Sequence, residues 1–159
     1  IEKAIFACGC FWGVQHQMER AKGVIRSTVG YTGGKEQHPT YQEVKAHTTG
    51  HAEAVLVEYD AEQTTYKELC KLFFEIHDPA QSDGQGPDIG PQYRSEIFYL
   101  NEAQKAEAEA IIQLLREKGY EVNTRLTPAS EFWPAEDYHQ HYYDKTGGEP
   151  YCHIRVKKF

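Results

Sequence analysis

Short apolar segments recur along the chain, and glycine-rich turns separate them. Residues 3–8, KAIFAC, are apolar and β-prone and run into a glycine, which predicts a first strand. Residues 24–34, VIRSTVGYTGG, predict a strand that ends in a glycine turn, and residues 51–60, HAEAVLVEYD, predict another. Residues 95–100, SEIFYL, and 120–129, YEVNTRLTPA, predict two further strands.

Helical spacing of apolar residues predicts three helices, over residues 13–21, 65–77 and 102–118. The second helix carries one apolar stripe, formed by Tyr66, Leu69, Cys70, Phe73 and Ile76. Asn101 and Gln104 form a capping-box pattern that opens the third helix, and Gly119 closes it.

Two parts of the chain lack periodicity. Residues 78–94 contain three prolines and three glycines and are predicted to form a long loop, which in a compact domain is usually functional or disordered. Residues 131–159 are aromatic-rich and predict an irregular C-terminal tail. The order β-α-β-β-α-loop-β-α-β predicts an α+β two-layer sandwich with a ferredoxin-like, split βαβ core, in one domain over residues 1–159.

Charge and composition narrow the function classes. The chain has 159 residues, with 24 acidic and 17 basic side chains and a net charge of −7. This balance argues against nucleic acid or an anionic membrane as a partner, because clustered Lys and Arg bind both. We see no signal peptide and no apolar run of the roughly 18 residues that a membrane span needs. Four cysteines are too few for a disulfide scaffold, so we expect the reducing cytoplasm as the compartment. We also expect a monomer.

The stretch CGCFWG, residues 8–13, is the strongest chemical pattern from local sequence alone. Cys10 falls where the first predicted strand ends and a helix begins, and a helix N-terminus favours the reactive thiolate. A buried, inert thiol is the alternative. Phe11 and Trp12 point in different directions at a helix start, so one core does not easily take both rings. We expect them to form an apolar wall that receives a small group, such as a methyl.

Six blocks of the chain together resemble the peptide methionine sulfoxide reductase A family. They occur in the family's order and span nearly the whole chain: GCFWG (9–13), HPTYQEV (38–44), GHAEAV (50–55), GPDIGPQYRS (86–95), PAEDYHQHYY (134–143) and YCHI (151–154). The resemblance implies reduction of methionine S-sulfoxide, free or in proteins, as a repair of oxidative damage.

The resemblance also implies roles for individual residues. Cys10 would attack the sulfoxide sulfur, and Glu53 would donate a proton to the oxygen. Strand phasing puts Glu53 on the face of Val55, Val57 and Tyr59, opposite Ala52, Ala54 and Leu56; an apolar site there would raise its pKa and keep it protonated. A solvated glutamate is the alternative. Tyr41, Asp88 and Tyr93 match family positions around the sulfoxide oxygen, where a hydroxyl can donate a hydrogen bond.

Recycling is implied by the same resemblance. Cys10 would become a sulfenic acid and condense with Cys152, and an external dithiol, thioredoxin, would reduce the disulfide. No bound cofactor is expected. Cys70 lies on an apolar stripe and is expected in the core. Cys8 is expected to pack at a strand end, with a role as a backup resolving thiol left open.

Two alternatives remain from the residues. A cysteine hydrolase would use a histidine such as His139 to activate Cys10, and a peptide-binding module would use the Phe11 and Trp12 wall without chemistry. His139, His141, Cys152 and His153 share the tail, but they lack the regular short spacing of zinc ligands, so no metal is expected. No P-loop or GxGxxG motif suggests a nucleotide.

Overall fold

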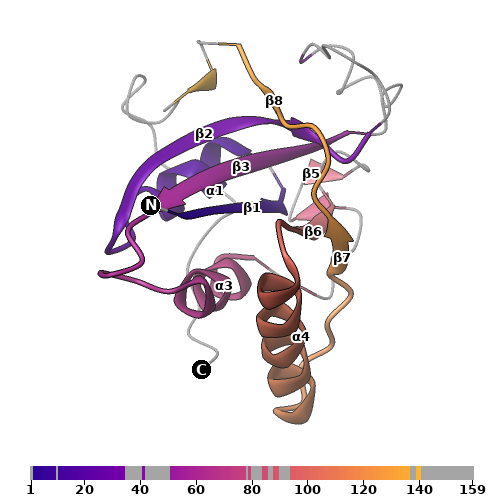
Figure 1. Cartoon of the computed structure of the whole chain (residues 1–159). Coiled ribbons are helices and arrows are strands. Elements are labelled where there is room, and N and C mark those ends of the chain that lie inside the picture. The colour runs from indigo at the N-terminus through magenta and orange to yellow at the C-terminus, as the bar shows by residue number, and fades with distance from the viewer. Residues whose placement is uncertain are drawn as a thin grey trace.

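One mixed sheet with helices against one face organises the computed structural model (Figure 1). The structure describes residues 2–9, 11–34, 41, 51–77, 79, 84–85, 88–89, 94–136 and 139–140. The strands are β1 (Glu2–Cys8), β2 (Val24–Thr32), β3 (Ala52–Tyr59), β4 (Gly84–Gln85), β5 (Asp88–Ile89), β6 (Ser95–Tyr99), β7 (Arg125–Pro128) and β8 (Trp133–Pro134). The helices are α1 (Phe11–Met18), α3 (Tyr66–Glu75) and α4 (Glu102–Glu117).

The strand order confirms the predicted fold class. The six-stranded sheet runs β7-β6-β1-β3-β2-β8, and β4 and β5 form a separate antiparallel pair. Its four central strands, β6-β1-β3-β2, are all antiparallel to their neighbours. With α1 after β1 and α3 after β3, they form the split βαβ arrangement of a ferredoxin-like core. β7 adds a parallel strand beside β6, and β8 adds an antiparallel one beside β2.

The sheet has one helix-covered face and one thinner face. On the helix side, Val55 and Val57 of β3 belong to the main apolar core together with residues of α1, α3 and α4. On the other side, Ala52 and Ala54 form a smaller cluster with Phe98. The predicted alternation along β3 is therefore confirmed, and it places Glu53 on the helix-covered face.

The helix predictions hold in type, and their ends differ by up to three residues. All five residues of the predicted α3 stripe are buried: Tyr66, Leu69, Cys70, Phe73 and Ile76. The side chain of Asn101 accepts a hydrogen bond from the backbone of Gln104 and so caps α4. Gly119 follows α4 with φ +96°, a conformation in which glycine avoids the steric cost of a side chain. α1 begins at Phe11, two residues before the predicted start, and ends at Met18.

One strand prediction, one tail prediction and one loop prediction need correction. Only Arg125–Pro128 of the predicted 120–129 segment is a strand. The segment predicted to be an irregular tail begins with β8, which pairs with β2 through Gly30 and Tyr31. The predicted loop at 78–94 contains the short β4–β5 pair. Among the described residues, no helix combines the length and apolar character needed to cross a bilayer.

Candidate active site

The turn between β1 and α1 brackets position 10. Cys8 is the last residue of β1, Gly9 has φ +103°, and Phe11 is the first residue of α1. A positive φ of this size is accessible to glycine at little cost, so Gly9 allows the strand to turn directly into the helix. The exposed N–H groups at the start of a helix create a positive electrostatic environment near this turn.

Glu53 lies beside that helix start. Its side chain projects from β3 to the helix-covered face and is only 1% exposed. One carboxyl oxygen, Oε1, accepts a hydrogen bond from the backbone N–H of Phe11 at 3.3 Å. The Phe11 nitrogen is joined by the peptide bond to residue 10. The carboxyl of Glu53 is therefore held within one residue of the Cys10 position.

An aromatic cluster gathers around Phe11 and Trp12 at this helix start. Phe11 lies 5.7 Å from Tyr31, 6.3 Å from Tyr41 and 5.2 Å from His139, measured between ring centroids. Trp12 joins the same cluster, 6.3 Å from Tyr41 and 5.5 Å from His139. Tyr31 is the direct cross-strand partner of Glu53 in the sheet. The cluster therefore combines residues from α1, β2 and two separate connecting segments.

The two rings of the predicted wall differ in burial. Phe11 is wholly buried and belongs to the main core, whereas Trp12 is partly buried and packs against it. The core therefore takes the Phe11 ring completely and the Trp12 ring only in part, in line with the expectation that one core does not easily take both rings. The helix start lies over the sheet, so the first ring faces inward and the second lies at the margin. The partly buried rings are those of Trp12 and Tyr41.

Glu136 holds the cluster from the side of β8. Its carboxylate accepts a hydrogen bond from the Tyr31 hydroxyl at 2.9 Å and another from the Tyr41 backbone N–H at 3.2 Å. Burial alone would raise the pKa of Glu136, but its backbone hydrogen bonds, the Tyr31 hydroxyl and nearby His139 together lower it below the ordinary value. The carboxylate is therefore held in its charged form.

Gln140 ties the same segment to the edge of the sheet. Its side-chain amide accepts from the Val29 N–H at 2.9 Å and donates to the Val29 carbonyl at 2.9 Å. It also donates to the Ala135 carbonyl at 3.1 Å. A side-chain amide thus replaces a neighbouring strand along β2 just beyond β8. Neither Glu136 nor Gln140 was predicted from the sequence, where the block PAEDYHQHYY was the only signal that included them.

Comparisons with known proteins match this arrangement to one family. The family model described as peptide methionine sulfoxide reductase matches residues 2–159. A relative from Acinetobacter baumannii (strain AYE), peptide methionine sulfoxide reductase MsrA, is 46% identical over 156 residues, which cover 98% of this chain and 90% of the relative. The chain belongs to the peptide methionine sulfoxide reductase family. It is accordingly an oxidoreductase that reduces methionine sulfoxide at the expense of thiols.

Solved structures agree with the family assignment. The reduced form of Mxr1 from Saccharomyces cerevisiae superimposes with a TM-score of 0.89 at 34% identity and covers 97% of this chain and 91% of its own. Mxr1 in complex with Trx2 superimposes with a TM-score of 0.64 at 25% identity, covering 99% of this chain and 90% of its own. The fold of this reductase is therefore that of the solved family members.

The structure describes only some of the predicted site residues of this methionine sulfoxide reductase. Phe11, Trp12, Tyr41 and Glu53 lie together in one cluster. Asp88 lies in β5, opposite Gln85 in the β4–β5 pair. The predictions for Cys10, Tyr93 and Cys152 fall outside the described residues.

The two described cysteines lie in the core of the reductase. Cys70 is buried in α3, where burial raises the pKa of its thiol far above the ordinary range. Cys8 is fully buried at the end of β1 and contributes to the main core. The predictions that both pack in the interior are confirmed. Within the described ranges, no group of three His, Cys, Asp or Glu side chains gathers as metal ligands.

The family assignment and the contacts of His139 both argue against the cysteine-hydrolase alternative. His139, its proposed base, accepts a hydrogen bond at Nδ1 from the Trp12 indole at 2.9 Å. An indole N–H can only donate, so this nitrogen of His139 is already engaged as an acceptor.

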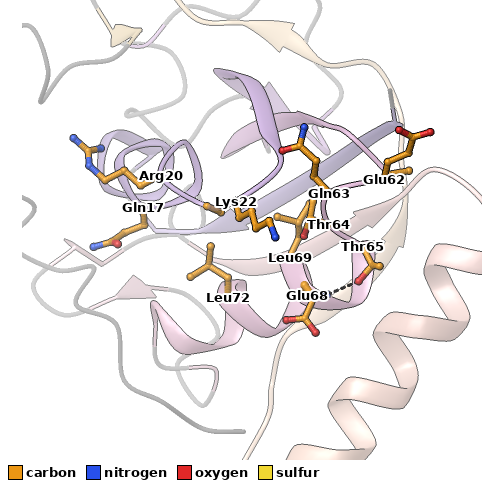
Figure 2. A pocket seen from close by; sticks show the side chains of 12 residues that line it. Gln17, Arg20, Lys22, Glu62, Gln63, Thr64, Thr65, Glu68, Leu69 and Leu72 are labelled. Carbon is orange, nitrogen blue, oxygen red and sulfur yellow. Dashed lines mark hydrogen bonds between the residues drawn. The ribbon is translucent and has the colours of Figure 1, made fainter.

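A cavity among the described residues lies away from this site. About 550 Å³ in volume, it opens between the end of α1, the turn after β3 and the first turns of α3, and Figure 2 shows its lining. Charged and polar side chains line most of it, among them Arg20, Lys22, Glu62 and Glu68. It contains none of the predicted site residues and none of the aromatic cluster.

Proposed function

We propose that Cys10 is the nucleophile of this methionine sulfoxide reductase and that Glu53 is its proton donor. The observation that carries the proposal is the hydrogen bond between the Glu53 carboxyl and the Phe11 N–H at 3.3 Å. It holds a buried carboxyl beside the helix start where the position-10 thiol belongs. Burial disfavours the ionised carboxyl, and the helix start favours the ionised thiol. The acid and the nucleophile therefore have complementary environments.

The first chemical step transfers oxygen from the substrate to the enzyme. The Cys10 thiolate attacks the sulfoxide sulfur, and Glu53 delivers a proton to the oxygen as the sulfur–oxygen bond weakens. The bond breaks with transfer of the hydroxyl to the cysteine, giving methionine and a Cys10 sulfenic acid. Sulfur of the substrate is reduced by two electrons, and sulfur of Cys10 is oxidised by two.

Substrate binding would use the partly buried part of the aromatic cluster. The Trp12 ring receives the methyl group of the sulfoxide, and Phe11 supports it from the core. Tyr41, with Asp88 and Tyr93 from the 78–94 segment, supplies polar groups toward the oxygen, by analogy with the family motif. Hydroxyl donors placed there would stabilise the negative charge that develops on oxygen.

Recycling would use the second cysteine and an external dithiol. Cys152 condenses with the sulfenic acid, releasing water and forming a Cys10–Cys152 disulfide. Thioredoxin then reduces that disulfide by thiol–disulfide exchange; the Mxr1 structure in complex with Trx2 supports this choice of partner. The reaction needs no bound cofactor. A reducing compartment such as the cytoplasm, where damaged proteins are repaired, suits such a cycle.

The decisive experiment distinguishes the roles of Cys10 and Cys152. We expect Cys10→Ser to lose sulfoxide reduction with any reductant. We expect Cys152→Ser to complete one turnover, to accumulate a sulfenic acid that dimedone traps, and to lose recycling by thioredoxin. Cys70→Ala serves as the matched control, because that thiol lies in the core. Full activity in Cys10→Ser would exclude the nucleophile assignment, and unchanged thioredoxin-dependent turnover in Cys152→Ser would exclude the resolving role.

A further inference from the structure

Trp12 reaches across the fold to a residue that lies far along the chain. Its indole Nε1–H donates a hydrogen bond to Nδ1 of His139 at 2.9 Å, over a separation of 127 residues. The two rings also stack, with centroids 5.5 Å apart and an interplanar angle of 28°. A partly buried indole at the second position of a short helix has several rotamers available. The hydrogen bond and the stacking together select one of them.

His139 is itself held firmly. Its ring is fully buried, and its backbone N–H donates to the Glu136 carbonyl at 3.0 Å. The next residue, Gln140, carries the amide that replaces a strand beside Val29. Glu136 in turn accepts from Tyr31 of β2. The imidazole is therefore fixed to the edge of the sheet, so it can fix the indole.

We propose that His139 is a positioning residue for the substrate: its Nδ1 accepts the Trp12 indole N–H and holds that ring where the methyl of the sulfoxide binds. The proposal rests on the role of Trp12 given under the proposed function. Nδ1 has to be unprotonated to accept, so the neutral ring carries its proton on Nε2. His139 does not touch the reacting atoms in this assignment; it acts through Trp12.

The surroundings of His139 favour that tautomer and charge state. Burial lowers the pKa of His139, and the carboxylate of Glu136 opposes this shift without reversing it. The other described groups that pack on the ring are the aromatic side chains of Phe11, Trp12 and Tyr41, with the Tyr41 centroid at 4.3 Å. The Glu136 carboxylate is the charged group that favours the protonated form of His139, and burial outweighs it. Protonation at low pH would replace the acceptor by a donor and release the indole.

The first test examines the geometry without any substrate. Long-range ¹H–¹⁵N spectra of the wild-type protein at neutral pH are expected to show His139 with Nδ1 unprotonated and a proton on Nε2. In His139→Leu, the indole N–H resonance of Trp12 is expected to move upfield as its acceptor is lost, while that of Trp133 stays in place. The opposite tautomer, or an unmoved Trp12 resonance, would overturn the proposal whether or not the enzyme reduces sulfoxides.

The second test examines catalysis, with dithiothreitol as reductant. We expect His139→Leu to raise KM for methionine sulfoxide about tenfold and to change kcat less than twofold. His139→Asn keeps an acceptor near the Nδ1 position and is expected to recover most of the affinity. His16→Asn, one turn further along α1, is the matched control and is expected to behave as wild type.

A double-mutant cycle makes the test specific to the pair. Trp12→Phe removes the donor, so adding His139→Leu to it is expected to raise KM little further. Independent effects that multiply in the double variant would overturn the proposal, as would an unchanged KM in His139→Leu. Circular dichroism and thermal unfolding establish that each variant is folded. Loss of activity in Cys10→Ser tests the proposed function separately, because it does not depend on Trp12 geometry.

Discussion

At the scale of single residues, Glu53 faces two opposite demands. Its burial at 1% exposure disfavours charge, whereas the hydrogen bond from the Phe11 N–H favours it. The proposed mechanism requires this carboxyl to hold a proton until the substrate oxygen takes it. The same side chain also completes the start of α1, so its loss has a structural and a chemical part. A substitution that keeps the acceptor separates the two.

Glu53→Gln is that substitution. The amide oxygen still accepts from Phe11, but the side chain no longer supplies an acidic proton. We expect the rate of the first turnover, followed as sulfenic acid formation, to fall about 100-fold at neutral pH. Glu58→Gln, on the same strand but the opposite face, is the control and is expected to react at the wild-type rate. An unchanged first turnover in Glu53→Gln would remove the residue from proton transfer.

Glu136 gives a prediction about acid stability. Its folded-state pKa is lowered from the ordinary 4.5, so its stabilising effect is complete above that value and is lost as pH falls through the lowered one. We expect Glu136→Gln to reduce the free energy of unfolding by about 1 kcal/mol at pH 7, allowing for solvent screening. Urea unfolding at several pH values should show this difference shrinking below about pH 4.5. A difference that stays constant down to pH 3 would contradict it.

At the scale of elements, a buried hydrogen-bond network joins α3 to β6 and to the segment before β7. His77 Nδ1 lies 2.6 Å from the Phe73 carbonyl, and its Nε2 lies 2.8 Å from the Ser95 hydroxyl. That hydroxyl lies 2.7 Å from Thr124. Because a carbonyl only accepts, Nδ1 of His77 carries the proton and Nε2 accepts from Ser95. This hydrogen-bond network therefore holds together the two ends of the 78–94 segment, which carries Asp88 and Tyr93.

Ser95→Ala is expected to break this hydrogen-bond network at its centre. It removes the partner of both His77 Nε2 and the Thr124 hydroxyl within a buried site, and we expect a loss of about 1–3 kcal/mol in the free energy of unfolding. Chemical denaturation measures this loss, and KM for the sulfoxide reports whether the anchored segment has shifted. Ser130→Ala, at an exposed position, is the control. Equal stability of both variants would show that the hydrogen-bond network contributes nothing to the free energy of unfolding.

The elements also show which parts of the fold were predictable. β3 was placed correctly because its alternation is regular and both of its faces are covered. β8 and β5 have two residues each, so neither carries a period that a pattern can reveal. β5 pairs with the adjacent β4, whereas β8 exists because of a partner distant in sequence, with Tyr31 opposite Trp133. Short strands of this kind are decided by tertiary pairing rather than by local preference.

Only part of the candidate site could be predicted from the sequence. Glu53 was found because its motif and its strand phase agreed. The sequence did not show which of Phe11 and Trp12 would enter the core, because the direction of a side chain at a helix start depends on where the helix lies over the sheet. The hydrogen bond between Trp12 and His139 joins residues 127 positions apart, and neither residue carries a local signal of it. Glu136 was missed for the same reason.

At the scale of the whole molecule, the proposed cycle requires the two ends of the chain to meet. Position 10 follows the first strand, and position 152 lies close to the last residue. Such closure leaves a simple chemical record: without reductant, the enzyme consumes one equivalent of sulfoxide and its own mass falls by two hydrogen atoms. The change in protein mass is easy to interpret, because the single methionine, Met18, is fully buried in the core. Met18 is therefore shielded both from oxidation and from being reduced as a substrate.

We expect intact mass spectrometry of the reduced protein, mixed with excess methionine sulfoxide, to show that loss together with one methionine released per chain. Alkylation under denaturing conditions should then label two cysteines in place of four, and peptide mapping should identify Cys8 and Cys70 as the labelled pair. In Cys152→Ser, the mass should instead rise by one oxygen, because the sulfenic acid has no partner. Oxidation that leaves Cys152 labelled in the wild type, or joins Cys10 to Cys8, would show that the resolving thiol lies at the turn beside the nucleophile rather than near the end of the chain.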